Sequence, residues 1–135
     1  MGKGNNKLSD YNTEELFKLE PLELTELLLA EYNFEIPYNE ENISIHDLYA
    51  AQKLMAQIGN YIPYMAYLNS IAKIKVRKAK RDKLSKDEID DAIDRKEVIN
   101  NFYESLNMQY NTVSRLVTVK KMINEELRMT DGITI

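Results

Sequence analysis

Residues 73–86 read KIKVRKAKRDKLSK and separate the two longest apolar repeats of the chain. Before and within this stretch, apolar residues spaced by three and four predict one buried helix face. They are Met65, Leu68, Ala72, Val76 and Ala79. After it, a second repeat with the same spacing consists of Ile89, Ala92, Ile99, Phe102, Leu106, Tyr110, Val113, Leu116, Ile123 and Leu127. The pattern predicts an all-α fold built on a long helical hairpin.

The first long helix should begin near Ile45, because Ser44 followed by Asp47 resembles a capping box. Gly59 and Pro63 interrupt its pattern. Proline removes a backbone donor and clashes with the preceding turn, so we expect a kink or a short break over residues 59–62. The helix should then continue to about Lys83.

The second long helix is predicted over residues 86–128. Ser85 and Glu88 form a capping box at its start, and no glycine or proline occurs between Pro63 and Gly132. Gly132 is the expected end of this helix, because glycine commonly follows the last helical turn.

The chain is expected to form a single domain over residues 1–135. In this domain, residues 1–43 precede the hairpin at 44–128. Residues 1–12 include the Gly- and Asn-rich start and are expected to be a flexible N-terminus, frayed over residues 1–9. Residues 13–43 should hold short helices and a loop at 33–42. One helix should start after Asn12 or Thr13, and the next at Pro21. The second has an apolar face of Leu22, Leu24, Leu27, Leu28 and Leu29.

A helix of about 43 residues is about 65 Å long, whereas a compact chain of this size has a radius of gyration of about 14 Å. The hairpin therefore either bends or projects. We expect its apolar stripe to be covered by other copies in a helical homo-oligomer. The alternative is a monomer in which the N-terminal leucine-rich helices cover the stripe.

Charge is strongly segregated along this acidic chain of net charge −4. Residues 73–86 carry eight basic side chains and one acidic one, 8 − 1 = +7. At 100° per residue, Lys73, Arg77, Lys80 and Arg81 lie opposite the first apolar stripe. Such a row suits a polyanion backbone. The alternative is a solvated helix face, although uncompensated like charges at this spacing repel one another.

Other side chains could extend this surface. Tyr64 and Tyr67 lie off the apolar stripe just before the cations, and aromatic rings beside a cationic groove stack on bases in single-strand binders. Core packing is the alternative for tyrosines at helical spacing. Arg115 and its neighbours Lys120 and Lys121 either add to the cationic surface or pair with Glu125 and Glu126, the second being favoured for Lys121.

The sequence offers little for catalysis or for a cofactor. It has no cysteine and one histidine, His46, without a second nitrogen or sulfur ligand nearby. The acidic cluster over residues 87–94 could hold Mg²⁺, but helix-start acids usually complement the helix dipole. We find no phosphate loop or nucleophile motif. We expect no enzyme activity, no cofactor, no membrane span and a cytoplasmic location, in the host cell if the chain is phage-encoded.

The order of features resembles the recombination mediator proteins of T4-type phages, the UvsY family. A helix, the segment KAKR at 78–81, an acid-rich turn and a long helix ending YNTVSRLVTVKK carry the resemblance, over residues 45–128. A short Leu-Lys-Ala-Arg motif of that family contributes to binding single-stranded DNA. Lys78 and Ala79 match it, whereas Arg77 stands at its Leu position and Lys80 at its Arg position.

The resemblance implies a ring-like helical oligomer that helps a RecA-like recombinase replace single-strand-binding protein on DNA. The expected partners are single-stranded DNA, the recombinase, single-strand-binding protein and further copies of the chain. A protein-binding helical module, such as a phage-encoded inhibitor of a host protein or an assembly factor, is the alternative. The candidate nucleic-acid-binding residues are Tyr64, Tyr67, Lys73, Lys75, Arg77, Lys78, Lys80, Arg81, Lys83 and Arg115.

Overall fold

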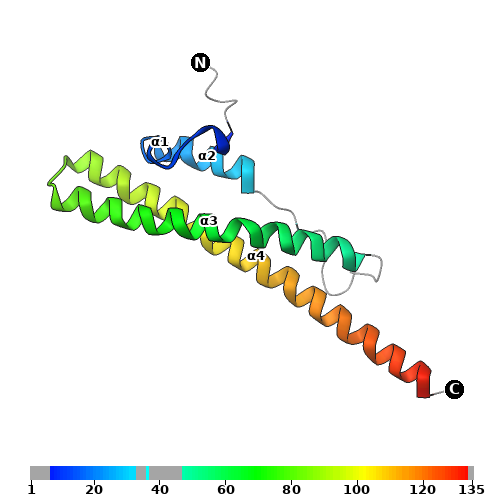
Figure 1. The fold of residues 1–135 in the computed structure, drawn as a ribbon. Coiled ribbons are helices and arrows are strands. Elements are labelled where there is room, and N and C mark those ends of the chain that lie inside the picture. Colours follow the sequence, from blue (N-terminus) through cyan, green and yellow to red (C-terminus); the bar gives the residue numbers. More distant parts are fainter. Residues whose placement is uncertain (1–6, 33–35, 37–46, 134–135) are drawn as a thin grey trace. The chain divides into compact units, whose positions relative to one another are not determined.

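The computed structural model confirms an all-α fold, a long helical hairpin preceded by short helices (Figure 1). It describes residues 7–32, 36 and 47–133, and the side chains only as far as residue 127. The elements are η2 (Leu8–Asp10), α1 (Thr13–Leu16), α2 (Pro21–Tyr32), α3 (Leu48–Arg81) and α4 (Lys86–Ile133).

The chain forms two compact units, and both long helices run through both of them. The first unit comprises Met1–Phe34 and Ile62–Ser105, and therefore holds the short helices, the hairpin turn and the helix segments next to it. The second comprises Glu35–Tyr61 and Leu106–Ile135. Both candidate tyrosines and every predicted cation except Arg115 belong to the first unit.

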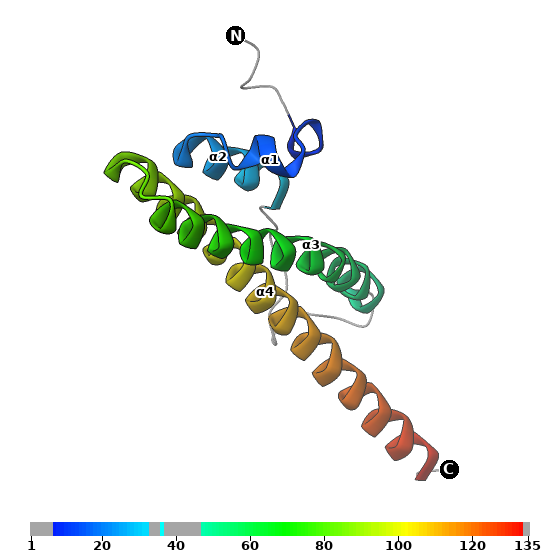
Figure 2. The same ribbon diagram turned by 60° about the vertical axis from the view of Figure 1, so that its left-hand side comes forward.

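In the first unit, the predicted face of α3 is the core. Met65 and Leu68 are fully buried, and Ala72, Val76 and Ala79 are between 1% and 6% exposed. Ile99 of α4 is buried as well. Figures 1 and 2 both show α3 and α4 running antiparallel here, with α1 and α2 alongside. The periodicity predicted this core correctly because the helix repeat places these positions on one side.

The core repeat on α3 is a heptad. Ala51, Ile58, Met65, Ala72 and Ala79 are buried at intervals of seven, as are Ile99, Leu106 and Val113 on α4. A repeat of seven in a helix of 3.6 residues per turn favours a left-handed supercoil with interlocking side chains. The hairpin is therefore built from coiled-coil-like seams.

The short helices begin where the sequence predicts. The Asn12 side chain accepts a hydrogen bond from the Glu15 N–H at 2.8 Å, and Glu15 accepts one from the Asn12 N–H at 3.2 Å. Pro21 occupies the first position of α2, where its missing N–H has no helical partner to lose. However, Leu22 is 70% and Leu29 48% exposed, so the predicted leucine face is wrong at these positions. The buried face of α2 is Leu24, Leu28 and Tyr32, spaced by four.

The predicted fraying of the N-terminus does not extend to residues 8–10, because Leu8 is buried in a 3₁₀ turn. Residues 1–6, most of the predicted loop at 33–42, and the Ser44 cap lie outside the described residues. So do the expected helix start at Ile45 and His46. The first described residue of α3 is Leu48.

Of the kink or short break predicted over residues 59–62, the break is wrong. Helix α3 continues through residues 59–62 and contains Pro63. Buried side chains on either side, Ile58 and Met65, stabilise the helix enough to offset the lost backbone hydrogen bond. Gly59 has a different role in the second unit, because a Cβ there would lie 3.0 Å from Cε2 of Tyr110.

The predicted end of α4 is also wrong. The helix continues to Ile133, so Gly132 lies within it. Glycine terminates a helix only when it adopts the left-handed conformation, and nothing prevents it from taking the right-handed one. In the described part of the chain, no helix is both long and apolar enough to cross a membrane.

Candidate nucleic-acid interface

The hairpin turn fixes the position of the cations. The N–H of Lys83 donates to the Lys80 carbonyl at 3.2 Å, and the N–H of Leu84 donates to the Ala79 carbonyl at 3.1 Å. This pair of bonds is a Schellman motif, which ends α3. On the other side of the turn, the Glu88 N–H donates to Ser85 Oγ at 3.2 Å, which confirms Ser85 as the N-cap of α4. Ser85 Oγ in turn donates to Glu88 Oε1 at 3.2 Å.

Lys83 adopts a left-handed backbone conformation, with φ of 53°, at the position where glycine is preferred. A residue with a Cβ costs about 1–2 kcal/mol in this conformation. The turn therefore has a lysine at a position where glycine would make the folded protein more stable.

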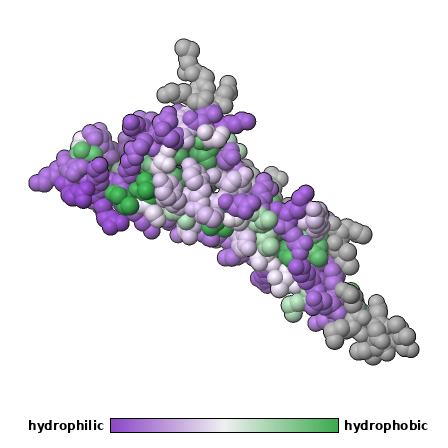
Figure 3. Space-filling view, viewed as in Figure 1, coloured by the Kyte–Doolittle hydropathy of each residue, from purple (hydrophilic) through white to green (hydrophobic). Residues whose placement is uncertain are grey.

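The cations of α3 and the turn form one exposed surface, which we call the cationic face. It consists of Lys73, Arg77, Lys78, Lys80, Arg81 and Lys83. Within the described part of the chain, the one ion pair that involves any of these six is the contact of Arg81 with Asp82, at 3.8 Å. Figure 3 shows a largely hydrophilic surface at the end of the hairpin that carries the turn.

Lys75 is the exception among the predicted cations of α3. Its Nζ lies 3.0 and 3.1 Å from the two carboxylate oxygens of Glu14, and 5.9 Å from the centre of the Phe17 ring. Its side chain is 34% exposed. Lys75 points to the flank of α3 that α1 covers and is paired with Glu14, so it lies outside the open row of cations. Its contact with DNA stays a prediction.

Glu14 lies in the field of several cations. The hydrogen bond and the charge of Lys75, together with the charges of Lys18 and Lys78, hold the pKa of Glu14 below its ordinary value of 4.5. The carboxylate is therefore ionised at neutral pH. No sequence pattern indicates this contact, because Glu14 and Lys75 are 61 residues apart.

Tyr64 and Tyr67 lie on the surface, in agreement with their predicted place off the core stripe. They are 37% and 50% exposed, with ring centroids 6.5 Å apart and planes inclined by 28°. Partial burial, and then the proximity of Tyr67, raise the pKa of Tyr64 above its ordinary value of 10.0. Its phenol is neutral at pH 7 and adds no negative charge beside a phosphate.

The structure adds one residue that the sequence reasoning missed. Ile74 is 52% exposed, seven residues after Tyr67 and seven before Arg81. Positions seven apart lie within about 20° on a helix. Tyr67, Ile74 and Arg81 therefore form one line along the outer side of α3. The heptad spacing from Tyr67 was the signal that could have identified Ile74.

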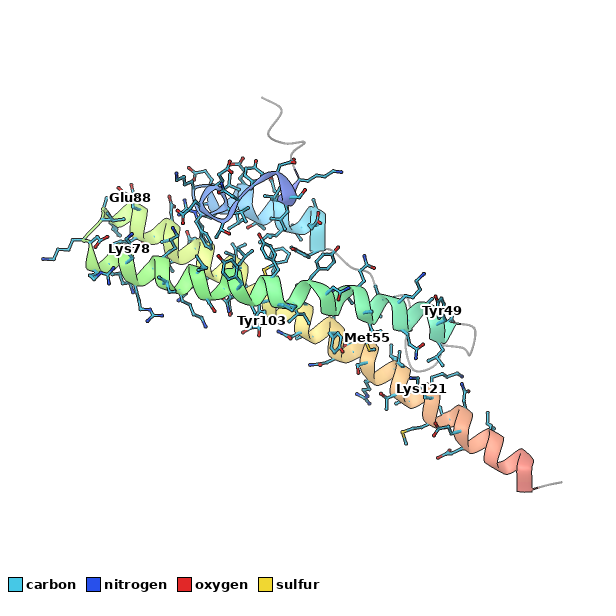
Figure 4. All side chains as sticks on the ribbon, viewed as in Figure 1. Tyr49, Met55, Lys78, Glu88, Tyr103 and Lys121 are labelled. Carbon is cyan, nitrogen blue, oxygen red and sulfur yellow. The ribbon has the colours of Figure 1, made fainter. Side chains whose placement is uncertain are left out.

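Arg115 belongs to the second unit and is exposed, but it already interacts with another group. The predicted ion pair between Lys121 and Glu125 does not form in the described part of the chain. Exposed pairs of long side chains gain little over solvation, so spacing alone is weak support for one. Figure 4 places Lys121 on α4, and Lys78 and Glu88 on either side of the turn.

The acidic residues that follow the turn do not form a cation site. In the described part of the chain, no group of three or more Asp, Glu or His side chains is placed to hold a metal ion. No protein-family model, curated protein or solved structure matches this chain.

Proposed function

We propose that this chain binds single-stranded DNA along the cationic face, and that it does so without catalysis. The observation that supports the proposal is the near absence of internal neutralisation, since five of the six side chains have no carboxylate partner within 4.0 Å among the residues that the structure describes. The positive charge is therefore available to phosphates, whose condensed counterions would be released on binding.

The tyrosines favour a single strand over a duplex. Exposed rings next to cations can stack on unpaired bases, whatever the sequence. Tyr67 offers such a ring just before the cationic face, and Ile74 offers apolar surface within it. Replacing Tyr67 by alanine should therefore weaken binding of oligonucleotides of every sequence by about 1–3 kcal/mol. Fluorescence anisotropy with labelled oligonucleotides measures this loss.

The salt dependence of binding tests the proposal directly. If Lys73, Arg77, Lys78, Lys80 and Arg81 each neutralise one phosphate, log affinity should fall with log salt at a slope of about −3.5. Replacing Lys73, Arg77 and Arg81 together by alanine should reduce the slope to about −1.4, which corresponds to an affinity loss of about 100-fold at 0.1 M salt. Binding of the unaltered chain that does not depend on salt would refute the proposal.

A charge-matched variant provides the control. Lys53, Lys96 and Lys121 lie outside the cationic face, and their joint replacement by alanine changes the net charge equally. This variant should keep the slope of the unaltered chain. Circular dichroism should show that both triple variants are folded, because none of the six side chains is buried.

The wider role follows from the resemblance to the UvsY family. We infer that the DNA-bound protein assists a RecA-like recombinase in replacing single-strand-binding protein. A strand-exchange assay on DNA already covered by single-strand-binding protein tests this step. It should show a shorter lag with the unaltered chain than with the variant that lacks Lys73, Arg77 and Arg81.

Self-association is part of the same proposal. On α4 in the second unit, Met122, Ile123 and Leu127 are between 42% and 57% exposed, although the last two belong to the predicted apolar stripe. A second copy could cover them. Light scattering with and without an oligonucleotide measures the mass that decides this point.

A protein partner is the second candidate, favoured by the exposed side chains of Ile74 and Leu84 next to the cations. Apolar anchors surrounded by charge are typical of protein interfaces. An electrophoretic shift with a labelled oligonucleotide separates the candidates, since a chain that binds only an acidic protein surface gives no shift.

A further inference from the structure

Resting on the proposed function, we propose that Glu14 is an internal competitor of DNA phosphate for Lys75, so that Lys75 becomes an additional phosphate contact when the carboxylate leaves. Oligonucleotide binding by variants of Glu14 and Lys75 distinguishes a failure of this inference from a failure of DNA binding itself.

The geometry of the contact resembles that of a bound anion. Both carboxylate oxygens of Glu14 lie within 3.1 Å of the Lys75 ammonium, which is the arrangement that two phosphate oxygens would take. Lys18 and Lys78 also act on this carboxylate through their charges. Glu14 therefore lies where the positive charges of Lys75, Lys18 and Lys78 act together on one carboxylate.

The contact can open at little cost. The Glu14 side chain is 69% exposed, and an ion pair this exposed contributes little to stability. A phosphate that already binds Lys78 would find Lys75 one turn away on the same flank, because residues three apart are neighbours on a helix. A local rotation of Glu14 suffices, without separation of the helices.

Two other contacts hold the N-terminal segment in place when the ion pair opens. The Arg95 Nε–H donates to the Leu19 carbonyl at 2.6 Å, and Leu24 and Leu28 of α2 are buried. Beside Lys75 lies a cavity of about 310 Å³, lined among others by Phe17, Lys18, Leu84 and Arg95. Its volume leaves room for a phosphate, and its three cations exceed its two carboxylates, Glu88 and Asp91, by one.

The test is a double-mutant cycle on Glu14 and Lys75 in the full chain. Glu14→Gln should bind a labelled oligonucleotide about 5-fold more tightly at 0.1 M salt, with a slope steeper by about 0.7, the effect of one added phosphate contact. Lys75→Gln alone should change affinity less than 2-fold, because Lys75 is occupied by Glu14. The double variant Glu14→Gln/Lys75→Gln should lose the gain.

Glu26→Gln is the matched control, because it changes the net charge equally and because Glu26 is exposed on α2 and has no ion pair with any described residue. An equal gain in Glu26→Gln and Glu14→Gln would mean a general charge effect and would overturn the inference. So would unchanged affinity in Glu14→Gln, or a gain that persists in the double variant. If no variant binds at low salt, the proposed function itself fails. A thermal melt establishes that each variant is folded.

Discussion

Replacing Asn69 by leucine should stabilise the protein, because this is the one polar residue among the buried side chains of the described core. Asn69 is 6% exposed on α3. Its Nδ2 donates to Asn100 Oδ1 at 3.3 Å, but its own Oδ1 is buried without a hydrogen-bond partner. In the described part of the chain, no protein hydrogen bond compensates for the burial of this acceptor.

Four effects set the size of the change in the free energy of unfolding. Removing a buried unsatisfied acceptor gains about 1–3 kcal/mol, and losing the hydrogen bond to Asn100 costs about 0.5–1.5 kcal/mol. Burying a leucine side chain of similar volume gains about 1.5–3 kcal/mol, of which repacking next to Met65 and Ala72 removes about 1 kcal/mol or more. The net expectation is a gain of about 1–3 kcal/mol. For a chain of this length that raises Tm by about 4–12 °C.

Urea unfolding followed by circular dichroism measures the free energy, and two variants serve as controls. Asn60 lies in the same helix but is exposed, so Asn60→Leu reports the change in helix propensity alone, about 0.5 kcal/mol. Asn69→Asp keeps the shape and buries a charge, and should destabilise by at least about 2 kcal/mol at pH 7. A loss of stability in Asn69→Leu, with the mass in solution unchanged, would refute the reasoning and mean that Oδ1 has a partner such as a bound water.

The other predictions concern the turn, the close approach in the second unit and the ion pair. Lys83→Gly should raise stability by about 1 kcal/mol in a urea titration, because glycine adopts the left-handed conformation without strain, and Lys83→Ala should give no such gain. Gly59→Leu should lower stability by about 1–3 kcal/mol, since its Cβ meets the Tyr110 ring at 3.0 Å, and the loss should shrink when Tyr110→Ala is added. Glu14→Gln should lower Tm slightly at pH 7. Because the pKa of Glu14 is depressed in the folded state, its contribution is present above the ordinary value of 4.5 and disappears as the pH falls through the folded pKa, so melts below that pH should coincide. A difference in Tm that grows on acidification would contradict this linkage.

The sequence by itself determined that the chain forms a helical hairpin, and which side of α3 faces the core. The spacing of Met65, Leu68 and Ala72 predicts a buried stripe on any helix, and the cations opposite them are then exposed by geometry. The Ser85 cap was equally predictable, because its hydrogen bonds reach only three residues along the chain. These features depend on local periodicity and short-range bonding.

Only the tertiary structure decided which cations remain open. Lys75 carries the same charge as Lys78, yet it is paired, because folding brings Glu14 of α1 against one flank of α3. The role of Gly59 was misread for the same reason, since its partner Tyr110 comes from a distant part of the chain. Contacts between residues far apart in sequence leave no periodic signal, and a single sequence contains no other record of them.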